Sequence, residues 1–247
     1  MTSGRTSPAL CGCENELGAT AGNFVVKLRR TVQLRGLVNE LLGAELATHF
    51  GISSPVSALI TLEPKMAELI ACSEPAKAEF VKESIGFNFG TQILIGFNTW
   101  PVDKQVPETM RGLAVNVFAF DALLQNPDRT YGNPNLLTSG DAIMIIDHEL
   151  AFSFLRDISP STAPWVLDRQ PYLENHVFYR QLKSKTIDLT GFTARLRALS
   201  ETVLDEIFAD VPPEWNNEED GLKIREHLLA IRNHAEDFAE QIRRFLA

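Results

Sequence analysis

"LLQNPDRTYGNPNLL", residues 123–137, is a polar stretch that follows a long apolar segment and holds an Asp-Arg pair, a Gly and three Asn residues. Two interpretations compete for it. Asn, Pro, Asp and Gly are common turn residues, so a surface turn is the ordinary explanation. The alternative is a catalytic loop, in which Asp128 faces a substrate hydroxyl and Asn133 faces a metal ion. The stretch alone favours the turn, and the residues around it decide between the two.

With 247 residues, of which 45% are apolar and 22% charged, the chain has the composition of an ordinary globular protein. Its formal net charge of −9 argues against binding nucleic acid or an anionic membrane through a broad basic face. The N-terminal residues lack the apolar core of a signal peptide, and no run approaches the about 20 apolar residues of a membrane span. Cys11, Cys13 and Cys72 do not suggest a disulfide framework. We therefore expect a cytoplasmic protein.

The first part of the chain mixes strand and helix patterns. β-branched Val25 and Val26 lead a predicted strand to Lys27. The leucines of segment 34–50 then recur at helical spacing, and Gly51 stands where a helix would end. Two further strands are expected, at 53–64 and at 91–97.

From residue 107 onward the pattern becomes mainly helical. Pro107 suits the first turn of a helix. A short apolar strand, closed by Asp147, follows the quoted loop. Segment 222–247 repeats apolar residues at the spacing of an amphipathic helix packed on a core, with His227 and His234 expected on its solvated face.

These patterns predict an α+β fold with two lobes. Residues 1–98 would form a small mixed N-lobe with antiparallel strands and a helix. Residues 99–247 would form a larger, mainly helical C-lobe that carries the quoted loop.

Five polar residues stand in an order that suits phosphoryl transfer. Asp128 lies five residues before Asn133, and Asp147 ends an apolar strand fourteen residues further on. Lys27 lies on a strand of the other lobe, and Glu40 lies on the helix after it. The reaction needs a carboxylate at the attacking hydroxyl, hard oxygen ligands for magnesium, and a phosphate-binding cation held by an acid. This order recurs in the protein-kinase pattern and favours the catalytic interpretation of the loop.

The sequence also departs from ordinary protein kinases. Asn126 and Pro127, instead of His-Arg, precede Asp128, and Asp147 is followed by His148 and Glu149 instead of Phe-Gly. No spaced triple-Gly loop precedes Lys27. These differences exclude an ordinary protein kinase.

The chain instead resembles the HipA-like kinases, relatives of the phosphatidylinositol kinases. The resembling segments are "FDALLQNPDRTYGNPNLL", "IIDHELAF", "FVVKL", "NELLGAELATHFGISSP" and the N-terminal "GRTSPAL". The likeness covers most of residues 4–155, and the central loop is its most specific part. The family implies a protein-kinase-like fold in two lobes.

Carried over to this sequence, the resemblance implies Asp128 as the catalytic base, Asn133 and Asp147 as magnesium ligands, and Lys27 as the cation on the phosphates of ATP. Glu40 would be the partner of Lys27, with Glu45 as the alternative. The implied acceptor is a Ser or Thr hydroxyl of a protein. Because some members are toxins of toxin–antitoxin pairs, an antitoxin-like partner protein is implied as well, without direct binding of nucleic acid or membrane.

Three alternatives stay open at this point. Residues 3–13 would either form a short phosphate-covering loop or belong to a frayed terminus. The protein would either transfer phosphate or act as an idle nucleotide-binding or interaction module. A small-molecule kinase is also compatible with the motifs, and a defined pocket beside Asp128 would favour it.

Overall fold

Two antiparallel sheets and a set of helices form the part of the chain that the computed structural model describes, residues 8–158 and 163–247. The strands are β1 (Ala9–Glu14), β2 (Thr20–Lys27), β3 (Ser57–Leu62), β4 (Gly86–Gln92), β5 (Asn98–Thr99), β6 (Leu136–Ser139) and β7 (Ala142–Ile145). The α-helices are α1 (Leu34–Phe50), α2 (Pro64–Ser73), α3 (Ala78–Lys82), α4 (Arg111–Leu124), α5 (Tyr179–Leu182), α6 (Thr190–Ala198), α7 (Glu201–Ala209), α8 (Glu218–Asn233) and α9 (Ala235–Phe245). Short 3₁₀ helices are η1 (Pro75–Lys77), η2 (Glu108–Met110), η3 (Ser153–Arg156), η4 (Leu167–Arg169), η5 (Pro171–Asn175) and η6 (Pro213–Trp215). The expected α+β fold is confirmed.

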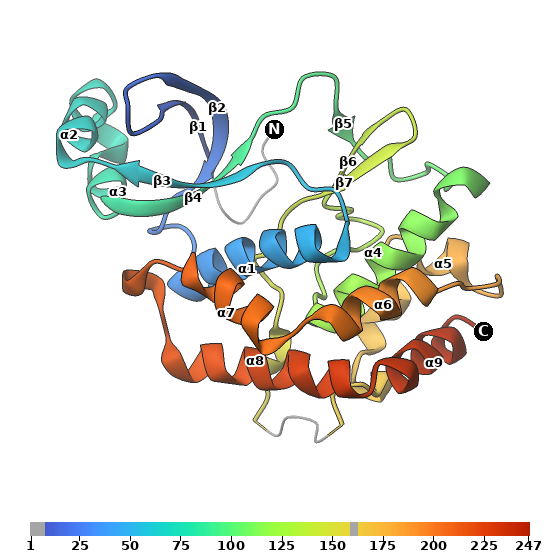
Figure 1. Cartoon of the computed structure of the whole chain (residues 1–247). Helices are drawn as coiled ribbons and strands as arrows, with labels where there is room; N and C mark the ends of the chain where they lie inside the picture. The colour runs from blue at the N-terminus through green and yellow to red at the C-terminus, as the bar shows by residue number, and fades with distance from the viewer. Residues whose placement is uncertain (1–7, 159–162) are drawn as a thin grey trace.

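The first four strands form one antiparallel sheet in the order β1-β2-β4-β3 (Figure 1). Alternate residues of a strand point to opposite faces. Phe24 and Val26 therefore share one face of β2, where they pack with Phe80 of α3. Lys27 lies on the other face, opposite Phe89 of β4. Because Phe89 packs against α1, this register directs Lys27 toward the same helix.

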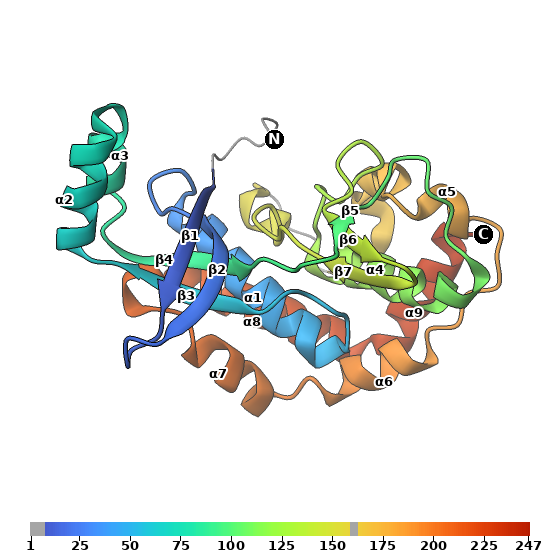
Figure 2. The same ribbon diagram turned by 90° about the horizontal axis from the view of Figure 1, so that it is seen from above.

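Helix α1 connects the four-stranded sheet to the rest of the molecule. Leu37 and Leu41 pack beneath the sheet, whereas Leu46 and Phe50 belong to the large core around α4. Seen from above, α1 runs from the four-stranded sheet toward the three-stranded one (Figure 2). The helix ends at Gly51, whose φ of 65° is left-handed and whose N–H donates to carbonyls of the last turn. The helix predicted for 34–50 is thus confirmed at both ends.

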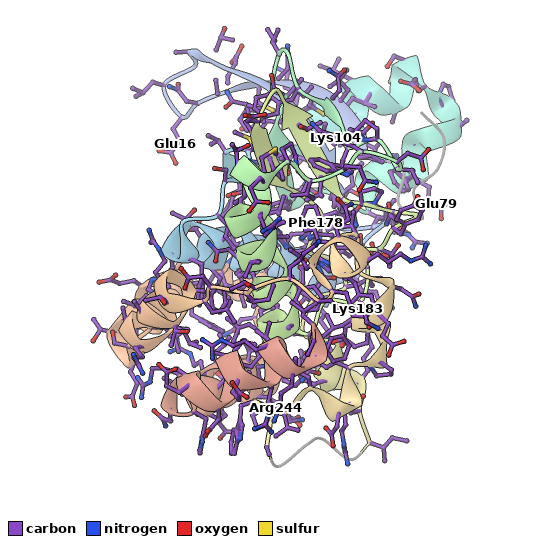
Figure 3. All side chains as sticks on the ribbon, turned by 90° about the vertical axis from the view of Figure 1, so that its right-hand side faces the viewer. Glu16, Glu79, Lys104, Phe178, Lys183 and Arg244 are labelled. Carbon is purple, nitrogen blue, oxygen red and sulfur yellow. The ribbon has the colours of Figure 1, made fainter. Side chains whose placement is uncertain are left out.

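Helix α4 is the centre of the large core. Ten of its fourteen residues are buried, as expected for a helix that is apolar on nearly every side. Side chains surround α4 in Figure 3, and Phe178 lies beside it, fully buried. The labelled charged residues Glu16, Glu79 and Arg244 lie at the periphery. The core therefore lies in the helical part of the molecule and supports the loop that follows α4.

The second sheet has the order β5-β6-β7 and brings two distant motifs together. Leu136, at the start of β6, pairs with Ile145, at the end of β7. The loop that enters β6 and the segment that leaves β7 consequently lie at the same end of this hairpin. Asp128 is in the first of these, and Asp147 is in the second.

The strand predicted at 91–97 is wrong in position. Only Thr91 and Gln92 belong to β4, which begins at Gly86 and pairs with both β2 and β3. Ile95, in the connection that follows, is fully exposed. The apolar residues after Gln92 predict a strand, but their last part has no pairing partner in the described structure.

The single helix predicted for 222–247 is also wrong, because the helical segment breaks at His234 into α8 and α9. His227 is buried, and its ring stacks on Phe154 with the centroids 4.1 Å apart. Its Nε2 lies 2.9 Å from the carbonyl oxygen of Leu123 at the end of α4. The expectation of a solvated His227 is thus overturned. Within 8–158 and 163–247, no helix combines the length and apolarity needed to cross a lipid bilayer.

Candidate active site

Lys27 is the last residue of β2, and its ammonium group lies against a carboxylate of α1. Lys27 Nζ contacts Oε1 of Glu40, the partner assigned from the sequence. Glu40 is buried, and its Oε2 accepts a 2.9 Å hydrogen bond from the backbone N–H of His148. A buried carboxylate requires such partners because it has lost its contacts with water. In the described parts of the chain, Glu45 makes no contact with Lys27.

Two further carboxylates reach the same ammonium group from the segment after β7. Lys27 Nζ lies 2.8 Å from Oδ1 of Asp147 and 3.3 Å from Oε2 of Glu149. One carboxylate oxygen from each of Glu40, Asp147 and Glu149 lies within 4.8 Å of the others. This charged cluster joins β2, α1 and the β6–β7 hairpin at one point.

The charges of this cluster shift the pKa values of its members. Burial alone would lower the pKa of Lys27, but the carboxylates of Glu40 and Asp147 outweigh burial and raise that pKa above its ordinary value. Burial raises the pKa of Glu40 to about 7; the charge of Lys27 opposes this shift, and the charge of Asp147 adds to it. Burial would also raise the pKa of Asp147, but the adjacent Lys27 lowers it. Lys27 and Asp147 are therefore both charged at neutral pH.

Asn39, the neighbour of Glu40 on α1, fixes the backbone that follows Asp147. Its Nδ2 donates 2.8 Å hydrogen bonds to the carbonyl oxygens of both Glu149 and Ala151. Asn39 is buried, so these bonds are shielded from water. Helix α1 thus holds the segment after β7 through its backbone as well as through the charged cluster.

Two glycines on α1 let this segment approach the helix closely. A Cβ atom at Gly43 would lie 2.5 Å from Cβ of His148, and one at Gly36 would lie 2.9 Å from Cγ of Glu149. Residues three, four and seven positions apart share a helix face, so both glycines lie on the side of Asn39. A glycine inside a helix is less favourable than alanine by about 1 kcal/mol. Here it provides the space that His148 and Glu149 occupy.

Asp128 lies in the loop between α4 and β6, where three asparagines surround it. Its Oδ2 accepts hydrogen bonds from Nδ2 of Asn135 at 2.9 Å and of Asn133 at 3.1 Å. Its backbone N–H donates to Oδ1 of Asn126. Burial raises the pKa of Asp128; the two amides oppose this shift, and the charge of Asp147 adds to it. The carboxylate is thus oriented, half-buried and more basic than an ordinary aspartate, which suits a proton acceptor.

Asn133 is exposed at the end of this loop. Its amide nitrogen donates to Asp128, so a metal ion would have to bind its Oδ1. No hydrogen bond joins Asn133 to Asp147 in the residues that the structure describes. The structure therefore brings Lys27, Glu40 and Asp147 into contact, and it connects Asn133 to Asp128.

Arg129, the residue after Asp128, is completely buried beneath the loop. Its Nε donates to Oδ2 of Asp121 at 2.6 Å. Its Nη1 donates to the carbonyl oxygens of Asn135 and Ile146, at 2.9 Å for the latter. Arg129 thereby ties the loop before β6 to the residue that precedes Asp147. Its position next to an acid in a polar loop did not distinguish it from a surface arginine in the sequence.

Asp121, on the last turn of α4, contacts two further polar side chains besides Arg129. Asn126 Nδ2 donates to its Oδ1 at 3.0 Å, and Nε2 of His176 lies 3.0 Å from its Oδ2. Burial opposes ionisation, but the Arg129 guanidinium and His176 together lower the pKa of Asp121 to about 2. A buried charge pair with further hydrogen bonds fixes the geometry of the loop above it.

Left-handed backbone conformations flank the two loops. The φ values are 48° at Gln125, 48° at Asn135, 63° at Asp147 and 55° at Phe152. Residues with side chains seldom adopt such angles, which persist only where the surrounding contacts impose them. Among the described residues other than glycine, Ser184 alone has a positive φ away from this region. Strain is therefore concentrated where Asp128 and Asp147 are positioned.

Sequence reasoning missed Glu149, Arg129 and Asp121. Glu149 could have been noticed because it lies two residues after Asp147, where polar residues interrupt an apolar segment. Its contact with Lys27, however, depends on the position of α1. Residues 3–7 of the predicted phosphate loop lie outside the described residues. Residues 9–13 belong to strand β1.

The oxygen atoms that the loop before β6 and the segment after β7 offer are of the kind that binds a magnesium ion. Asp147, Glu149 and Asn133 offer carboxylate and amide oxygens, the ligands that hard divalent cations prefer. Lys27 supplies one positive charge against the three carboxylates of the cluster, which leaves an excess of negative charge. The residues present therefore fit a divalent cation.

A cavity of about 370 Å³ borders the loop on its outer side. Thr130, Tyr131 and Gly132 form one wall, and Arg180 stands over the Tyr131 ring at 5.5 Å from its centroid. The backbone N–H of Tyr131 donates to the carbonyl of Asn175 at 3.0 Å, which ties the loop to the opposite wall. A concave surface thus begins two residues after Asp128.

A protein-family model matches residues 1–242 of the chain. The description of that model is "HipA-like kinase". No curated protein matches the sequence.

Proposed function

Since this chain belongs to the HipA-like kinase family, we propose that it transfers the γ-phosphoryl group of ATP to the hydroxyl of a Ser or Thr residue in a protein substrate. The observation that carries the proposal is the contact of Lys27, from the four-stranded sheet, with Glu40 and Asp147. A strand lysine, a helix glutamate and an aspartate beyond the catalytic loop meet at one point, as phosphoryl transfer requires. An interaction module that binds no nucleotide would need none of these contacts, and the transfer assay below separates an active kinase from a module that only binds ATP.

In this proposal the two lobes meet at the charged cluster. Residues 1–98 form the nucleotide-covering lobe, and residues 99–247 form the lobe that carries the catalytic loop. Lys27 contacts the phosphates, while Glu40 keeps its ammonium group in place. The antitoxin-like partner implied by the family resemblance stays a prediction.

Asp128 acts on the acceptor in this scheme. The acceptor oxygen forms a bond to the γ-phosphorus while the bond from that phosphorus to the bridging oxygen breaks, so that ADP leaves. The proton of the acceptor hydroxyl passes to the carboxylate of Asp128. Asn135 and Asn133 orient this carboxylate, and burial makes it a better proton acceptor.

Asn133 and Asp147 would hold magnesium. When bound, the ion would neutralise the negative charge on the phosphates. Lys27 stabilises the same charge from the side of the four-stranded sheet. Arg129 keeps the loop and the Asp147 segment at a fixed separation, because it binds carbonyl groups of both.

The test is a transfer assay with ATP labelled in its γ-phosphate, magnesium and a heat-treated cell extract as the source of acceptors. Products are identified by mass spectrometry, and wild type is compared with Asp128→Asn. We expect labelled Ser or Thr residues with wild type and a rate about 10²–10⁴-fold lower with the variant, while ATP binding is preserved. Binding of ATP without any transfer by wild type would instead identify an idle module.

A small-molecule kinase is the second candidate, and the cavity beside Thr130 and Tyr131 favours it. The same assay separates the two candidates, because the extract can be divided by size before the reaction. Label that appears only in the fraction of small molecules would support the second candidate and contradict a protein acceptor.

A further inference from the structure

Glu149 is an acidic residue in the candidate site to which the proposed mechanism assigns no task. Its Oε2 lies 3.3 Å from Lys27 Nζ, the longest of the distances from that nitrogen to the carboxylates of the cluster. Glu40 and Asp147 make shorter contacts with the same ammonium group. Neutralising Lys27 therefore does not require Glu149.

The cluster carries more negative charge than Lys27 can balance. Carboxylate oxygens of Glu40, Asp147 and Glu149 lie within 4.8 Å of one another around a single ammonium group, so the acidic groups outnumber the cation even where Glu40 is partly protonated. Like charges at this separation repel one another strongly at a partly buried site. A divalent cation beside Asp147 and Glu149 would remove this repulsion.

Only two of these carboxylates can be reached from solvent. The side chains of Asp147 and Glu149 are 34% and 22% exposed, whereas that of Glu40 is 2% exposed. Both oxygens of Glu40 are also occupied, by Lys27 and by the His148 N–H. An arriving cation would therefore meet Asp147 and Glu149.

The position of Glu149 is built into helix α1. Asn39 binds its backbone carbonyl, and the missing side chain at Gly36 leaves room for its Cγ. A freely solvated surface glutamate would need neither feature. Glu149 is thus held beside Asp147 by contacts from a helix more than a hundred residues away in the sequence.

We propose that Glu149 is a ligand of the divalent cation in the kinase site, together with Asp147. This inference rests on the proposed function, since it assigns one more residue to the same site. A carboxylate that binds a divalent cation attracts Lys27 less, so the assignment also leaves Lys27 freer to contact phosphate. The site then combines an aspartate and a glutamate two residues apart with the amide of Asn133.

The test measures metal binding directly, without any reaction. Mn²⁺ replaces magnesium as a paramagnetic probe, and free Mn²⁺ is quantified by electron paramagnetic resonance in the presence of a non-hydrolysable ATP analogue. Glu149→Gln keeps the size of the side chain and removes its charge. We expect it to raise the Kd for Mn²⁺ by about ten-fold or more, since even residues behind the ligands contribute that much to metal affinity.

Glu45→Gln is the matched control, because it makes the same chemical change in a partly buried glutamate on α1 away from Lys27. It should leave the Kd for Mn²⁺ unchanged. Thermal melts establish that both variants fold. If Glu149 only positioned Lys27, the analogue would bind Glu149→Gln more weakly in the presence of EDTA; a ligand role predicts no such loss.

Two results would overturn the inference, and they are distinguishable. Wild type that binds Mn²⁺ and the analogue, with a folded Glu149→Gln protein that binds both equally well, removes Glu149 from the metal site and leaves the kinase proposal standing. Wild type that binds neither Mn²⁺ nor the analogue removes the kinase proposal, and the assignment of Glu149 falls with it.

Discussion

At the residue scale, Lys27 supports the fold as well as the proposed chemistry. It is the cation that balances the buried carboxylate of Glu40. Lys27→Met leaves that carboxylate without a counter-charge, and removal of one partner from a buried pair costs about 3–5 kcal/mol. We expect the double variant Lys27→Met/Glu40→Gln to recover most of this loss. Urea unfolding of the four proteins of this cycle measures the interaction between the two side chains.

The cost of Lys27→Met should depend on pH. Without Lys27, the folded pKa of Glu40 rises further above its unfolded value, so the folded state keeps Glu40 protonated. Stability is then retained below the unfolded pKa and is lost progressively as pH rises above it. The variant should consequently be closer to wild type at pH 5 than at pH 8. Equal losses at the two pH values, or additive effects of the two substitutions, would show that the pair does not interact.

At the scale of the element, replacing a glycine of α1 by alanine should change stability in the opposite direction from the same replacement in an ordinary helix. Replacing glycine by alanine inside a helix usually stabilises it by up to about 1 kcal/mol. Gly43→Ala should instead lower the melting temperature, because the new Cβ would lie 2.5 Å from Cβ of His148. The displacement of His148 should also weaken nucleotide binding, since its N–H holds Glu40.

Gly221 on α8 provides the comparison. A Cβ there would approach the Phe208 ring at 3.5 Å, which is ordinary van der Waals contact. Gly221→Ala should therefore raise the melting temperature. Thermal melts and nucleotide titrations of both variants check the contrast, which is contradicted if Gly43→Ala is as stable as Gly221→Ala.

The elements differ in how far the sequence predicts them. Helix α1 was predictable because its leucine spacing and its terminal Gly51 are local signals. The strand at 91–97 was misplaced because β4 is defined by pairing with β2 and β3, which an apolar run does not reveal. The apolar spacing continues across the break at His234. The pattern therefore predicts one helix where the structure has α8 and α9.

The residues of the candidate site likewise divide into those that local sequence signals predict and those that depend on contacts between distant segments. Asp128, Asn133 and Asp147 stand at recognisable spacings within one segment, and the strand and helix patterns suggested Lys27 and Glu40. The contacts of Glu149 with Lys27 and Asn39 join distant segments, as do those of Arg129 with Ile146. Such contacts depend on the tertiary structure, and nothing in the neighbouring sequence encodes them.

At the scale of the whole molecule, buried histidines should make the protein sensitive to mild acid. Burial lowers the pKa of His148 to about 3 and that of His227 to about 4, and it also lowers the pKa of His176. Below the ordinary pKa of about 6.5, the unfolded chain binds protons that the folded state excludes. The free energy of unfolding should therefore decrease as pH falls from about 6.5 to 5, by about 2 kcal/mol for each of His148 and His227. Glu40 opposes this change in part, because its folded pKa of about 7 lets the folded state bind a proton there before the unfolded chain does.

Urea unfolding between pH 7 and 5 measures this dependence above the range in which Asp121 is protonated. His148 is the residue to replace, because both of its ring nitrogens are buried without a hydrogen-bond partner in the described structure. His148→Leu should reduce the slope of the unfolding free energy against pH by the amount that corresponds to about one bound proton. An unchanged slope in a folded variant would show that His148 is protonated in the native protein.

The close approach of α1 to the segment after β7 also bears on how this protein and its descendants can diverge. In a descendant protein, a larger residue at position 36 would occupy the space of the Glu149 side chain. A larger residue at position 43 would collide with the side chain of His148. A larger residue at position 43 is thus tolerated only alongside a change at His148, and one at position 36 only alongside changes at Glu149 and at Val32, whose Cγ1 would lie 2.5 Å from the new Cβ. Positions 36 and 149, and positions 43 and 148, should therefore be inherited as pairs.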